Sequence, residues 1–205
     1  MEEAAQVLTS CDASSLVMDK LGDWAFGQGV TVAGFYFDYA VREEQSPASM
    51  LGAILKQVVS GLGEMPEEIA RAYEGQKQVI GGRAPQLADI VKMLQNTASM
   101  KRTFICIDAL DECVAGYRVK ILDSLNQVLQ SSQGTRLFMT GRPHIEAEVG
   151  KRLSGRGTTI RITPHRRDII SYLQRRLEED TTPDAMDGNL KADILKKISK
   201  DVSEM

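Results

Sequence analysis

Apolar positions along the chain follow two different periods. Unbroken or alternating runs rich in β-branched and aromatic residues predict strands at residues 30–39, 103–108, 135–140 and 158–162. Between these runs, apolar residues recur every three or four positions, which is the spacing of an amphipathic helix. Because strands and helices alternate, the pattern predicts an α/β fold in which a parallel sheet is flanked by helices.

Several predicted helices carry start and stop signals. A first helix covers residues 1–28 and ends at glycines; another begins at Ser46-Pro47, a capping hydroxyl followed by proline at the first helical position. Further helices are predicted after Pro66 and Pro85, and at residues 117–129 and 144–153. Beyond Pro164 the pattern predicts only helices. We therefore expect a core at residues 1–163 and the beginning of a helical subdomain at 164–205, cut off by the end of the chain.

Composition is that of an ordinary globular chain. The 205 residues include 26% charged and 42% hydrophobic residues, enough for one sizeable α/β domain or for one domain with a small appendage. The formal charge is only −3, from 25 basic and 28 acidic residues, so no strong attraction to nucleic acid or to a membrane surface is expected. Protein partners, including self-association, are the expected ligand class.

Cysteine usage and the N-terminus bear on the cellular location. Cys11, Cys106 and Cys113 are odd in number and lack metal-binding spacing, which favours a reducing compartment without a zinc site. No stretch has the roughly 20 apolar residues needed to span a bilayer, and the first residues carry acid where a secretory signal carries base. We expect a cytoplasmic location.

The strongest chemical signal is an acidic turn after a buried strand, in the stretch TFICIDALDEC at residues 103–113. In parallel sheets, ligands bind at the carboxyl ends of strands, where Asp108, Asp111 and Glu112 are placed. Asp108 is the candidate Mg²⁺ ligand, and Glu112, with Asp111, could position a water for attack on a phosphate. The alternative is an ordinary polar turn, which is common after apolar strands.

A second candidate residue follows the next strand. Arg142 comes directly after TRLFMT and Gly141. A guanidinium at a strand end beside the acidic strand matches the geometry of phosphate oxygens, so Arg142 is the candidate sensor of a terminal phosphate. Without the neighbouring acidic strand, a surface arginine in a turn would be the default interpretation.

These motifs together carry a family resemblance. IDALDEC resembles the Walker B segment, and LFMTGRPHIE the sensor strand, of NACHT-type NTPases of the fungal heterokaryon-incompatibility and nephrocystin-like N-terminal type. FYFDY, QSPASMLGAILKQ and PHRRDIISYL resemble consecutive parts of the same domain. The resemblance implies a P-loop NTPase fold of the STAND class, Mg²⁺ and ATP or GTP as cofactors, and a role in signal transduction.

One part of the family pattern is missing. The phosphate-binding loop GxxxxGK[ST] should precede the first helix, but residues 5–15, AQVLTSCDASS, contain neither glycine nor lysine. Nucleotide binding should therefore be impaired, because glycine-rich amides and the lysine supply much of the grip on the phosphates. The sheet should also lack its phosphate-loop strand, unless residues 2–8 supply a substitute.

Three hypotheses follow from the sequence. The chain is a NACHT-type switch or assembly core with incomplete nucleotide chemistry, which leaves its status as an enzyme open. Alternatively, it is a catalytically silent interaction scaffold derived from that fold. In a third interpretation, the sequence is a piece of a longer protein, truncated at both ends.

Overall fold

The computed structural model describes residues 10–77, 85–153, 157–162, 166–178 and 188–201. The chain divides into two compact units, one formed by residues 10–157 and the other by residues 1–9 and 158–205. The larger unit holds the sheet and all the candidate site residues. The predicted division into residues 1–163 and 164–205 stays a prediction.

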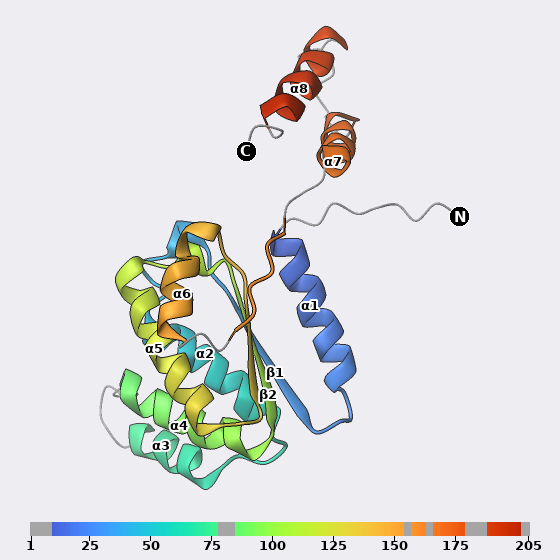
Figure 1. The fold of residues 1–205 in the computed structure, drawn as a ribbon. Helices are drawn as coiled ribbons and strands as arrows, with labels where there is room; N and C mark the ends of the chain where they lie inside the picture. The colour runs from blue at the N-terminus through green and yellow to red at the C-terminus, as the bar shows by residue number, and fades with distance from the viewer. Residues whose placement is uncertain (1–9, 78–84, 154–156, 163–165, 179–187, 202–205) are drawn as a thin grey trace. The chain divides into compact units, whose positions relative to one another are not determined.

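The larger unit is built on a parallel sheet of three strands in the order β1-β2-β3 (Figure 1). The strands are β1 (Val30–Tyr36), β2 (Arg102–Asp108) and β3 (Thr135–Met139). β2 is central, with Tyr36 level with Asp108 on one side and Met139 level with Ile107 on the other. The expected α/β fold is confirmed. The strand that the resemblance places next to the sensor strand is missing among the described residues.

Helices cover both faces of this sheet, but unequally. One face is covered by α2 (Pro47–Ser60), α4 (Leu87–Met100) and α5 (Ala115–Ser131), and the opposite face by α1 (Ser10–Ala25), as Figure 1 shows. α3 (Glu67–Lys77) and α6 (Glu146–Arg152) complete the unit. The largest fully buried side chains come from the first face: Met50, Leu51, Ile54, Val58, Leu94, Ile105, Ile107, Leu110, Ile121, Leu122, Leu125 and Val128. The main core therefore lies between the sheet and the α2–α4–α5 layer.

Local signals explain where the helices begin. The Ser46 side chain accepts a hydrogen bond from the Ser49 amide, and Pro47 is the first residue of α2, as the sequence predicts. α4 begins after Gln86, whose amide donates to the carboxylate of Asp89 in a capping box. The predicted end of the helix after Pro66 lies outside the described residues.

Two strand predictions need correction. β1 ends at Tyr36 rather than at residue 39, because Asp38 caps a short 3-10 turn at Tyr39–Val41 by accepting a hydrogen bond from the Ala40 amide. Residues 158–162 form no strand, and Ile160 and Ile162 are exposed. A strand persists only where a neighbour completes its backbone hydrogen bonds, and no described strand does so there.

A glycine in β1 leaves room for the end of the Met18 side chain of α1 against the sheet. A Cβ atom at Gly34 would lie 2.3 Å from the terminal carbon of Met18 on α1. No real side chain tolerates that distance, so only glycine leaves room for the methionine in its present position. The glycine in the run VTVAGFYFDY thus belongs to the strand and does not end it.

The outer edge of β1 is closed by a side chain. Gln57 of α2 accepts a hydrogen bond from the Gly34 amide at 2.9 Å and donates one to the Gly34 carbonyl at 2.9 Å. Its amide therefore makes the two bonds that another strand would make. A second chain could pair at Gly34 only by displacing this side chain.

Replacing Gln57 with leucine is expected to lower the free energy of unfolding by about 2 kcal/mol, because two backbone groups of Gly34 lose their partners. Urea titration followed by circular dichroism measures the loss. The matched control is Ser60→Ala on the same helix, which removes only an exposed bond to the Lys56 carbonyl. Equal stability of the two variants would show that the Gly34 edge does not need the amide.

The smaller unit is helical. Its described helices are α7 (Arg166–Glu178) and α8 (Gly188–Asp201), which contact each other. Both were expected from the apolar spacing after Pro164. In the described part of the chain, no helix has the length and apolar character needed to cross a membrane.

Candidate functional site

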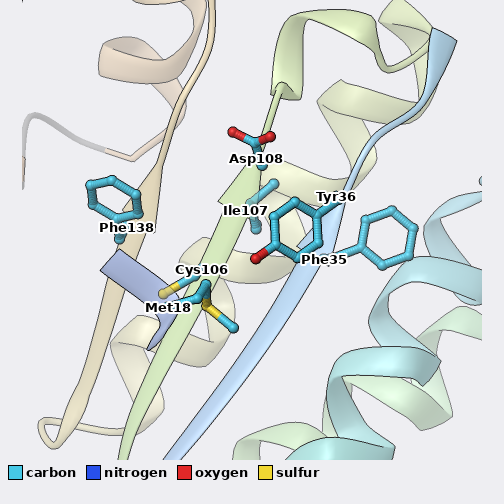
Figure 2. Close-up of a pocket in the computed structure, with 7 residues that line it drawn as sticks. All are labelled: Met18, Phe35, Tyr36, Cys106, Ile107, Asp108 and Phe138. Atoms are coloured by element: carbon cyan, nitrogen blue, oxygen red, sulfur yellow. The ribbon is translucent and has the colours of Figure 1, made fainter. Parts of the chain in front are cut away.

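The candidate site lies at the carboxyl ends of the three strands. Figure 2 shows Asp108 at the end of β2, with Tyr36 of β1 on one side and Phe138 of β3 on the other. Asp108 is 4% exposed, and its carboxylate accepts a hydrogen bond from the hydroxyl of Thr140, which directly follows β3. The buried carboxylate is thus tied to the neighbouring strand end.

The chain turns sharply after Asp108. Ala109 has φ 52° and ψ 44°, a left-handed conformation that costs a residue with a Cβ roughly 1 kcal/mol. Thr140 holds this turn, because its hydroxyl accepts a bond from the Ala109 amide at 3.0 Å and its carbonyl accepts one from the Leu110 amide at 3.0 Å. The strained turn begins the short 3-10 helix Leu110–Glu112, which carries the other two carboxylates, Asp111 and Glu112.

Asp111 binds the predicted sensor arginine. Its Oδ1 accepts a hydrogen bond from the Arg142 amide at 3.1 Å, and its Oδ2 lies 3.4 Å from Nε of the same residue. The Asp111 side chain is 8% exposed, whereas that of Arg142 is 76% exposed. The carboxylate therefore shapes the loop after β3, and the guanidinium extends toward solvent.

Glu112 contacts the loop after β1, whereas Asp111 contacts the loop after β3. Its Oε2 accepts a hydrogen bond from the Tyr39 amide at 3.0 Å, which ties the acidic turn to the loop after β1. Arg118 of α5, the helix that follows the turn, donates to the carbonyl of Cys113 at 3.1 Å and to that of Asp111 at 3.5 Å. The turn is thus held by both neighbouring loops and by the helix that follows it.

The structure brings the predicted residues to one edge of the sheet but gives each a separate partner. Asp111 and Arg142 are in contact, while Asp108 bonds Thr140 and Glu112 bonds Tyr39. The proposed catalytic and metal roles remain predictions. Thr140 was not predicted as a site residue. The sequence did contain a signal for Thr140: it is the polar residue that follows the last apolar position of the strand next to the acidic strand.

The arrangement does not by itself form a magnesium site. Among the described residues, no three His, Cys, Asp or Glu side chains gather into a group that could hold a metal ion. Mg²⁺ bound through one carboxylate needs phosphate oxygens and waters to complete its six ligands. Asp108 alone, already bonded to Thr140, supplies too few.

A hollow borders Asp108 on the α1 face of the sheet. It is lined by Met18, Phe35, Tyr36, Cys106, Ile107, Asp108 and Phe138, and it leaves no room for even a water molecule (Figure 2). Pockets for drug-sized ligands measure roughly 300–1,000 Å³, so this hollow is too small for a nucleotide. Burial raises the pKa of the Cys106 thiol to about 11, so the thiol stays protonated at neutral pH and is no nucleophile.

Comparisons with known proteins support the fold. The family described as nephrocystin 3, N-terminal, matches residues 12–142, which include all three strands and the candidate site residues. The structure is similar to that of the ORC1 protein of Aeropyrum pernix, determined in complex with DNA, with a TM-score of 0.50 and 18% identity. The similarity covers 87% of this chain and 44% of that protein, so the chain spans less than half of its length. No curated protein matches significantly.

Proposed function

Because this chain belongs to the nephrocystin 3 N-terminal family, we propose that it is the core of a fungal-type NACHT signalling protein whose nucleotide binding is impaired. The fold and the family support an NTPase-like origin. The resemblance of the acidic strand end and of the arginine after β3 to the family's motifs also supports the proposal. The sequence AQVLTSCDASS stands where a phosphate loop is expected.

One observation carries the proposal of impaired binding. Each of the three carboxylates expected to serve Mg²⁺ and water already accepts a hydrogen bond from the protein: Asp108 from Thr140, Asp111 from Arg142, and Glu112 from Tyr39. Each protein donor takes up part of the acceptor capacity of its carboxylate and fixes its orientation, so a bound ligand would have to fit the orientation that the protein sets. Without phosphate-loop amides, no described group offsets that constraint.

Titration of a fluorescent ATP analogue with Mg²⁺ into the purified chain tests this proposal. We expect no saturable binding up to about 1 mM, a loss of at least about 4 kcal/mol relative to a micromolar site. We also expect Asp108→Asn and Glu112→Gln to leave ATP turnover at the level of the unmodified chain, since neither carboxylate acts on nucleotide here.

The matched control is Asp123→Asn, which changes an exposed carboxylate on α5 away from the strand ends. Micromolar binding that Asp108→Asn abolishes and Asp123→Asn preserves would contradict the proposal. Such a result would show that the strand ends bind Mg²⁺ and nucleotide without a recognisable phosphate loop. Far-ultraviolet circular dichroism confirms that each variant is folded.

The second candidate function is a silent interaction scaffold acting on protein partners in the cytoplasm. The same hydrogen bonds favour it, because they use the acidic turn to join the loops after β1 and β3 to β2. A scaffold of this kind keeps the sheet rigid and needs no nucleotide cycle. It predicts association that does not respond to ATP or Mg²⁺.

A further inference from the structure

The backbone is strained at the first residue of the acidic turn, which covers residues 109–113. Among the residues that the structure describes, Ala109 is the only one other than glycine with a positive φ. A residue with a Cβ keeps this left-handed conformation only where its surroundings hold it there. Ala109 joins β2 to the 3-10 helix Leu110–Glu112. The position of that helix therefore depends on a conformation that Ala109 does not favour by itself.

Thr140, at the end of the neighbouring strand, holds the strained residue in place. Its hydroxyl accepts a hydrogen bond from the Ala109 amide at 3.0 Å and donates one to the buried carboxylate of Asp108. Its carbonyl accepts a bond from the Leu110 amide, and its amide donates to the carbonyl of Ile107. The bonds of Thr140 thus reach both sides of Ala109. Because one hydrogen bond contributes about as much free energy as the left-handed conformation costs, the two effects are closely balanced.

The acidic turn is bonded to one loop on each side of the central strand. On one side, Glu112 accepts a hydrogen bond from the amide of Tyr39 in the loop after β1. On the other side, Asp111 accepts one from the amide of Arg142 in the loop after β3. Both carboxylates belong to the same 3-10 helix, which begins directly after Ala109. A change of conformation at Ala109 therefore moves the acceptors of both loops together.

We propose that the acidic turn is a two-state element that couples these two loops, and that Thr140 is the residue that holds it in the observed state. In the observed state, Ala109 is left-handed and both carboxylates keep their amide partners. In the second state, Ala109 leaves the left-handed region and the 3-10 helix gives up both bonds at once. Because the two states differ at both loops, a protein partner that binds one loop shifts the equilibrium at the other.

Two contacts confine this change to the turn itself. The side chain of Leu110 is fully buried in the core, and Arg118 donates to the carbonyl of Cys113 at 3.1 Å. Neither contact uses the carboxylates of Asp111 and Glu112, so both contacts persist when those carboxylates leave their amide partners. The second state is therefore a local opening of the turn, and the sheet and its core stay folded.

Solvent exchange of the Tyr39 and Arg142 amides, measured by nuclear magnetic resonance on the full chain, tests the coupling. Thr140→Val removes the hydroxyl and keeps the branched shape of the side chain. We expect both amides to exchange at least about fivefold faster, the scale set by one lost hydrogen bond. Thr135→Val is the matched control, because Thr135 begins the same strand and its buried hydroxyl donates to Ser132. It is expected to change either rate less than about twofold, since it leaves the turn untouched.

A second substitution tests the strained backbone and does not depend on the folding of Thr140→Val. Ala109→Gly removes the cost of the left-handed conformation, because glycine has no Cβ. By itself it is expected to slow exchange at both Tyr39 and Arg142 by about fivefold, and in the Thr140→Val background it should restore much of the lost protection. The Gly34 amide, bonded at the outer edge of β1, is the internal reference in every variant. The test contains no nucleotide, so its outcome is independent of nucleotide binding.

Three results would overturn the proposal. The first is faster exchange in Thr140→Val at Arg142 alone or at neither amide, which would confine the effect of Thr140 to its own loop. The second is equal acceleration in Thr140→Val and Thr135→Val, because that would report a general loss of stability. The third is unchanged or faster exchange at both amides in Ala109→Gly, which would show that the left-handed conformation does not oppose the observed state.

Discussion

Replacing Arg118 with alanine is expected to lower the free energy of unfolding by about 3 kcal/mol, the scale observed when one partner of a buried ion pair is removed. The Nε of Arg118 lies 2.9 Å from Oε2 of Glu148 on α6, and the two side chains are 10% and 26% exposed. The same guanidinium donates to the carbonyls of Cys113 and Asp111. Its loss therefore removes one hydrogen-bond donor from the carboxylate of Glu148 and from the two backbone carbonyls of the acidic turn.

A second ion pair between the same helices provides the control. Arg152 on α6 lies 2.7 Å from Asp123 on α5, with side chains that are 31% and 51% exposed. Because water screens this pair, Arg152→Ala is expected to cost less than about 1 kcal/mol. Urea unfolding of both variants measures the difference. Similar losses would show that burial does not set the strength of the Arg118 contact.

Truncating Leu94 to alanine is expected to cost about 3 kcal/mol, because the lost methyl groups leave a cavity that a closely packed core cannot fill. Leu94 is fully buried on α4, the helix that packs against both α2 and α5. The expected result is a lower urea midpoint with an unchanged slope, since the folded state keeps its extent.

Leu87→Ala is the matched control for this core prediction. Leu87 lies in the first turn of the same helix and is only partly buried against the core. The same truncation there should cost about half as much or less, because solvent and neighbouring side chains fill the space. A Leu87 variant as unstable as the Leu94 variant would mean that the α2–α4–α5 layer is not the centre of the core.

The sequence by itself was sufficient to locate most helices and strands. The unbroken apolar run at residues 104–107 identified the central strand, and Ser46-Pro47 identified the start of α2. These signals are local, because periodicity and capping depend on neighbours within a few residues. The strand predicted at residues 158–162 failed for the opposite reason. Strand formation at these residues depends on a pairing strand from a distant part of the sequence, and an alternating apolar pattern does not indicate whether such a strand is present.

For the candidate site, the sequence determined which residues come to the sheet edge, and only the tertiary structure decided what they contact. Carboxyl ends of parallel strands meet at one edge, so Asp108, Asp111, Glu112 and Arg142 could be placed there from the strand pattern. The hydrogen-bond partners of these residues could not be predicted from the strand pattern. Glu112 bonds a residue 73 positions away, and Asp111 one that is 31 positions away. Such contacts depend on sheet register and on the backbone turn at Ala109, which no local pattern specifies.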